Sequence, residues 1–86
     1  MNQLAVSLAG HDKGSIYVIL SEDDSMVCLA DGKTKTLKRP KKKNPKHIRR
    51  IVHLPEEIKE ELKKACQDSD LVHVLRLYQA MQNEKR

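Results

Sequence analysis

Short apolar runs separated by turn residues follow one another closely over the first 54 positions of the chain. Residues 16–20 form a continuous β-branched and aromatic run, which is typical of a strand buried on both faces. Asp31-Gly32 is a strong hairpin signal. We expect five strands, at residues 4–8, 16–20, 26–30, 34–37 and 48–54. Five short strands on tight connections favour a small, strongly bent antiparallel barrel, which closes its own edges.

Two glycines bracket the first connection. Gly10 and Gly14 flank His11-Asp12-Lys13 between two apolar runs, and glycine permits the positive φ that a tight turn needs. Asp12 is expected to order this turn through hydrogen bonds to its own backbone. The fold requires such a turn whatever the function is.

The pattern changes at Pro55, because proline suits the first position of a helix. Ile58, Leu62 and Ala65 then recur at helical spacing and share one face. We therefore expect a helix that begins close to Pro55 and buries this face.

A second helix is expected after residues 67–70, which interrupt the first and offer Asp68 or Ser69 as an N-cap. Its apolar stripe consists of Leu71, Val74, Leu75, Tyr78 and Met81. The expected fold class is mainly β with an α appendage. A barrel over residues 1–54 precedes a helical tail of two helices over residues 55–86.

Positive charge is concentrated between residues 32 and 55. This segment holds ten Lys and Arg and no acid, whereas the whole chain has a formal charge of +5. Residues 1–31 hold one base and five acids, and residues 56–86 hold six bases and seven acids. Such asymmetry indicates a surface for a polyanion, although blocks of like charge are also common in solvated linkers. Prolines 40 and 45 are expected to keep the strip at residues 38–47 extended.

The residues favour neither catalysis nor metal binding. The acidic residues 22–24 are better explained as a solvated turn than as paired catalytic carboxylates. No nucleophile has an identifiable base, and no glycine loop with its lysine could hold a phosphate. The four histidines and two cysteines lack the short paired spacings of a zinc site. We expect no enzyme activity, no metal, no other cofactor and no small-molecule substrate.

The same residues indicate a cytoplasmic protein. Cys28 and Cys66 are expected to be reduced thiols. The sequence shows no secretory signal, and no run approaches the roughly 18 apolar residues that span a membrane.

Aromatic residues are scarce. Phe and Trp are absent, and Tyr17 and Tyr78 both lie in apolar runs where core packing is expected. Proteins that read single-stranded bases need exposed aromatic rings for stacking. The composition therefore favours recognition of structured RNA through its backbone and shape.

At this point the chain resembles a known family. Residues 4–31, with Gly14 between two apolar strands, resemble the KOW motif of several ribosomal proteins and transcription elongation factors. The continuation through Asp31-Gly32, Pro40-Lys41-Lys42-Lys43 and Lys46-His47 is similar to the KOW-type large-subunit ribosomal proteins of archaea and eukaryotes and to their short bacterial relatives. The resemblance implies an SH3-like barrel that binds RNA.

The resemblance covers roughly residues 3–50. His11 stands where the family usually has arginine, and the tail from Pro55 onward is not part of the match. The implied function is a ribosome-associated or translation-related factor that binds ribosomal or other structured RNA through backbone phosphates. In such a complex Gly10 would allow the RNA to approach closely, while His11 and Lys13 contact phosphate or sugar. The expected RNA-binding residues are Gly10, His11, Lys13, Gly14, Lys38, Arg39, Lys41, Lys42, Lys43, Lys46, His47 and Arg49.

Two alternatives remain open. KOW-type barrels also contact proteins, so the barrel and the amphipathic helices could form a protein-interaction module in a transcription or translation complex. An architectural DNA-binding protein is less favoured, because no helix of recognition type carries the positive charge.

Overall fold

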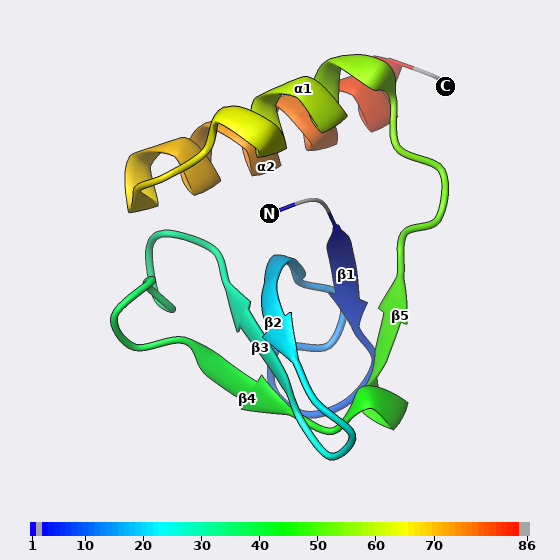
Figure 1. Cartoon of the computed structure of the whole chain (residues 1–86). Helices are drawn as coiled ribbons and strands as arrows, with labels where there is room; N and C mark the ends of the chain where they lie inside the picture. Colours follow the sequence, from blue (N-terminus) through cyan, green and yellow to red (C-terminus); the bar gives the residue numbers. More distant parts are fainter. Residues whose placement is uncertain (2, 85–86) are drawn as a thin grey trace.

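The computed structural model describes residues 1 and 3–84 of the 86-residue chain. The elements follow in the order β1 (Leu4–Ser7), β2 (Ile16–Glu22), β3 (Val27–Ala30), β4 (Lys41–Lys43), the 3-10 helix η1 (Pro45–His47), β5 (Ile48–Arg50), α1 (Glu56–Lys64) and α2 (Asp68–Glu84). Figure 1 shows the two helices lying together across one side of the sheet. The predicted fold class, five antiparallel strands followed by two helices, is confirmed.

The five strands form one curled antiparallel sheet with the order β4-β3-β2-β1-β5. β4 and β5 are its two edges, and residues 44–47 with η1 connect them directly along the chain (Figure 1). The result is a small barrel-like sheet in which the chain, and not strand pairing, joins the two edge strands.

The predicted fourth strand at residues 34–37 is wrong. Lys41–Lys43 pairs with β3 instead, and residues 31–40 form the connecting loop. Asp31 explains why this segment does not extend: its carboxylate accepts hydrogen bonds from the backbone N–H groups of Lys33 and Lys35 and from the Thr34 hydroxyl. Such local bonds compete with strand pairing. The fifth strand is also shorter than predicted, because β5 ends at Arg50.

The sheet has an apolar cluster on each face, as the alternation of side chains along a strand requires. The cluster inside the curl contains Ala5, Tyr17, Ile19, Val27, Leu29 and Ile48. The cluster beneath the helices contains Leu4, Val18, Ala30, Ile58, Leu62, Leu71, Val74, Leu75 and Tyr78. The residues before and after position 54 therefore share one core. Burial of Tyr17 and Tyr78 confirms that both tyrosines pack internally.

The second helix begins in a different way from the one predicted. The backbone N–H groups of Asp70 and Leu71 donate to the carbonyl of Gln67, so Gln67 occupies the capping position expected for Asp68 or Ser69. The carboxylate of Asp70 reaches back and accepts from the N–H groups of Cys66 and Gln67, as the acidic partner of a capping box does. The carboxylate of Asp68 does not cap this helix and instead accepts a hydrogen bond from the backbone N–H of Leu37.

Candidate nucleic-acid interface

The three lysines of β4 alternate between the two faces of the sheet. Lys41 pairs with Leu29 and Lys43 with Val27, and both partners belong to the cluster inside the curl. Directly opposed residues on neighbouring strands share a face, so these two lysines point inward. Lys42 pairs with Cys28 and lies on the opposite face, where it is exposed.

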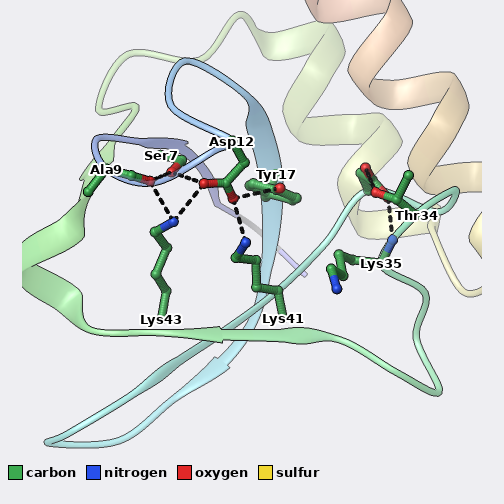
Figure 2. A network of polar contacts seen from close by, with 9 residues as sticks. Ser7, Ala9, Asp12, Tyr17, Thr34, Lys35, Lys41 and Lys43 are labelled. Atoms are coloured by element: carbon green, nitrogen blue, oxygen red, sulfur yellow. Dashed lines mark hydrogen bonds and ion pairs between the residues drawn. The ribbon is translucent and has the colours of Figure 1, made fainter.

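Asp12, in the turn between β1 and β2, receives both inward lysines. Lys43 Nζ lies 2.8 Å from Oδ1 of Asp12, and Lys41 Nζ lies 2.9 Å from Oδ2. The hydroxyls of Ser7 and Tyr17 also donate to this carboxylate, at 2.9 and 2.8 Å. Figure 2 shows the four donors converging on Asp12 from three strands. The contacts join the turn to the edge strand β4.

Lys43 is almost enclosed. Only 9% of the residue is exposed to solvent, and its amine donates a second hydrogen bond to the carbonyl of Ala9 at 2.9 Å. An amine that is buried with both a carboxylate and a carbonyl has a structural role, because breaking either contact leaves a charge poorly solvated. Lys43 therefore stabilises the fold by binding β4 to the turn that contains Ala9 and Asp12.

The hydrogen bonds that Asp12 accepts keep its carboxylate ionised. Burial acts to raise the pKa of Asp12, but the hydrogen bonds from Lys43, Lys41, Tyr17 and Ser7 outweigh it and hold the pKa far below the usual value of 3.8. Burial, together with the bond to the ionised Asp12, raises the pKa of Tyr17 to about 12. The local role predicted for Asp12 is wrong, because its carboxylate binds the side chains of Ser7, Tyr17, Lys41 and Lys43 and not the backbone of its own turn.

Sequence reasoning missed this cluster, although two signals point to it. Lys41 and Lys43 have the two-residue spacing of one strand face, and Ser7 is a hydroxyl within an apolar strand. A lone acid in the adjacent turn could have been assigned as their partner.

The turn itself is exposed and has the backbone that its glycines permit. Gly10 and Gly14 have φ of +84° and +91°, and His11 and Lys13 lie exposed between them. The backbone N–H of Leu8 donates to the carbonyl of His47 at 2.8 Å, which places the end of η1 beside the start of this turn. The turn and the carboxyl end of the basic strip therefore lie at one end of the sheet.

The strip at residues 38–47 does not run as one extended segment. Lys46 and His47 belong to η1, where the Asn44 side chain accepts a hydrogen bond from the N–H of Lys46. Lys38 and Arg39 lie at the opposite end, in the loop before β4. Pro45 explains the difference, because proline suits the first position of a helical turn as well as an extended chain. Arg49 lies on β5 opposite Val6 and is exposed.

Three of the ten cations between residues 32 and 55 bind acids within the chain. Lys41 and Lys43 bind Asp12, and Arg50 binds Glu22 through both guanidinium nitrogens. Among the side chains of residues 1 and 3–83 the other seven make no ion pair: Lys33, Lys35, Lys38, Arg39, Lys42, Lys46 and Arg49. These cations, with Lys13 of the turn, form the candidate interface.

The described residues contain neither a metal-binding group nor a helix that could span a membrane. No group of three histidine, cysteine or carboxylate side chains is placed to hold a metal ion, and Cys28 and Cys66 are free thiols. None of the described helices has both the length and the apolar character that crossing a membrane requires.

The chain matches no protein-family model and no curated protein.

Proposed function

We propose that this chain is a non-enzymatic, cytoplasmic RNA-binding protein with a KOW-type, SH3-like barrel. Its target is structured RNA of the translation apparatus, with ribosomal RNA favoured, and its contacts are to backbone phosphates. One observation carries the proposal: seven cations in a segment of 24 residues without an acid make no ion pair among the described residues. Three of them lie on β4, η1 and β5, and the other four lie in the loop between β3 and β4. The curled five-stranded sheet supports the SH3-like assignment.

The burial of the tyrosines supports backbone contact over base reading. Tyr17 and Tyr78 retain 4% and 7% of their exposed surface, so neither offers a ring on which a base could stack. Lysine and arginine side chains contact phosphates without reading the sequence of the RNA. Shape and charge are therefore the expected basis of recognition.

The interface differs from the one that the sequence predicts. Lys41 and Lys43 are committed to Asp12, so Lys42 is the residue of this run with its amine free for phosphate. Reversing all three charges would test stability and RNA binding at once. A sharper test leaves the inward pair intact.

The proposed experiment compares two triple variants of equal net charge. Lys38→Gln, Lys42→Gln and Lys46→Gln remove three exposed cations of the interface, and Lys59→Gln, Lys63→Gln and Lys64→Gln remove three exposed cations of α1. Affinity for a folded ribosomal RNA fragment is measured over a range of salt. The interface variant is expected to bind more weakly, with the slope of log affinity against log salt reduced by ~0.7–0.9 for each lost contact. The α1 variant is expected to retain the wild-type slope.

Equal losses in the two variants would show that net charge alone governs binding and would overturn the assignment of the interface. Wild-type protein that fails to bind structured RNA at low salt would overturn the function. Thermal unfolding of both variants checks that the comparison is made between folded proteins.

The helices offer less support for the protein-interaction alternative. The apolar face of α1, through Ile58 and Leu62, packs in the same cluster as Leu71 and Val74 of α2. These faces are used within the chain, so they do not provide an open amphipathic surface for a partner.

A further inference from the structure

The loop between β3 and β4 rests on the first turns of α2 at two points. The backbone N–H of Leu37 donates to Oδ1 of Asp68 at 2.9 Å. Gly32 lies so close to the helix that a Cβ atom there would overlap the carbonyl oxygen of Asp68 and lie 2.9 Å from Cγ2 of Val72. Figure 1 shows this loop reaching up to the start of α2. Contacts at both points fix the loop relative to the helix.

The contact between Leu37 and Asp68 lies next to two basic residues. Lys38 and Arg39 directly follow Leu37, and the N–H of Arg39 donates to the carbonyl of Thr36 at 3.1 Å. The position of the two cations therefore depends on where the Leu37 backbone is held. Placing charged side chains before binding reduces the ordering cost that binding must overcome.

The two acids at the start of α2 have different roles. Asp70 accepts from the N–H groups of Cys66 and Gln67 and thereby completes the start of the helix. Asp68 accepts from the loop instead. A carboxylate in the first helical turn is also compatible with the helix dipole, so Asp68 can face the loop at little cost to the helix.

We propose that Asp68 is a positioning residue for the RNA interface: its carboxylate holds the Leu37 backbone and so places Lys38 and Arg39. This gives the helical tail a part in RNA recognition, and it rests on the RNA-binding function proposed above. The loop contact itself can be tested without RNA.

The sign of the charge separates positioning from simple electrostatics. Asp68→Ala and Asp68→Asn each remove one negative charge, so attraction to phosphate alone would make both variants bind RNA more tightly. Asparagine retains a carbonyl oxygen that can accept the Leu37 N–H, whereas alanine does not. Positioning therefore predicts weaker binding for Asp68→Ala and a substantial rescue by Asp68→Asn.

The experiment measures hydrogen exchange of the Leu37 amide and affinity for the folded ribosomal RNA fragment. Asp68→Ala is expected to exchange Leu37 faster and to bind RNA about fivefold more weakly, as loss of one net hydrogen bond allows. Asp68→Asn is expected to stay close to wild type in both measurements. Asp70→Ala is the control, because it weakens the start of the same helix without removing a contact to the loop.

Three results would overturn the proposal. These are unchanged Leu37 exchange in Asp68→Ala, RNA binding by Asp68→Ala as tight as that of wild type, and an equal loss of RNA binding in Asp70→Ala. If wild-type protein binds no structured RNA, the proposed function fails, and Leu37 exchange alone then decides whether Asp68 holds the loop.

Discussion

The amine of Lys43 lies 2.8 Å from a carboxylate oxygen of Asp12, a residue 31 positions earlier in the chain. This contact joins the turn between β1 and β2 to the edge strand β4. Asp12 also binds Lys41, Tyr17 and Ser7, so one carboxylate connects β1, β2 and β4. The stability of the curled sheet should depend strongly on this single side chain.

Asp12→Asn is expected to lower the free energy of unfolding by about 2 kcal/mol, because it leaves the nearly buried amine of Lys43 without its counter-charge. Asp24→Asn makes the same change of net charge at an exposed position and is expected to stay within about 0.5 kcal/mol of wild type. Urea denaturation of the three proteins provides the measurement. Similar losses in both variants would contradict the special role of Asp12.

Low pH should remove the stabilisation that the Asp12 carboxylate gives to the folded protein. Its pKa in the folded protein is far below the usual value of 3.8, so the stabilisation is complete above that value and is lost as the pH falls below it. The stability difference between wild type and Asp12→Asn should therefore be constant near neutral pH and narrow steadily below pH ~4. The pKa values of Asp23, Asp31 and Asp70 are also lowered, but these groups are present in both proteins and cancel in the difference. A difference that is independent of pH would refute this account.

High pH should lower the stability of the fold by ionising Tyr17. Its pKa is raised from 10.0 to about 12, so the neutral phenol stabilises the fold below pH 10 and this contribution is lost as the pH rises toward 12. Titration of tyrosinate absorbance in Tyr78→Phe, where Tyr17 is the remaining tyrosine, should give a midpoint well above 10.

Tyr17→Phe removes the hydroxyl that donates to Asp12 and is expected to lower stability by about 1 kcal/mol at neutral pH. Wild type should lose stability between pH 10 and 12 as Tyr17 ionises, and Tyr17→Phe should lack this part of the loss. An ordinary tyrosine midpoint near 10 in the folded protein would exclude the hydrogen bond to Asp12 as described.

Two glycines allow backbone strain to be separated from close packing. Gly14 and Gly32 have φ of +91° and +83°, but a Cβ at Gly14 meets nothing within 4 Å, whereas one at Gly32 meets the backbone of Asp68. Gly14→Ala is expected to cost about 1–2 kcal/mol from its φ alone. Gly32→Ala is expected to cost about 1–3 kcal/mol more, since the loop or α2 must shift. Denaturation midpoints that coincide would show that the loop does not rest on the helix.

Parts of this fold can be predicted because local pattern and tertiary packing agree. The β-branched run at residues 16–20 lies within β2, and the apolar spacing through Ile58 and Leu62 gives the buried face of α1. β4 could not be predicted in this way. Three consecutive lysines have low strand propensity, and they form a strand because β3 pairs with them and Asp12 binds two of them.

The candidate interface shows the same division. Charge density identifies the segment between residues 32 and 55, but it cannot tell an inward lysine from an outward one. That distinction depends on strand register, which places Lys41 and Lys43 with Leu29 and Val27 and leaves Lys42 outside. The contact between Asp68 and Leu37 was not predictable either, because the two residues lie 31 positions apart and Leu37 contributes only a backbone N–H.

The inward lysines of β4 also bear on self-association. As an edge strand, β4 presents backbone groups to which a strand of another molecule could add. A second copy of the strand would place its own lysines beside Lys41 and Lys43, and like charges in opposed positions repel. Asp12 is already shared between two amines and has no charge left to neutralise two more. We therefore expect the inward lysines of β4 to oppose fibre-like growth from this edge.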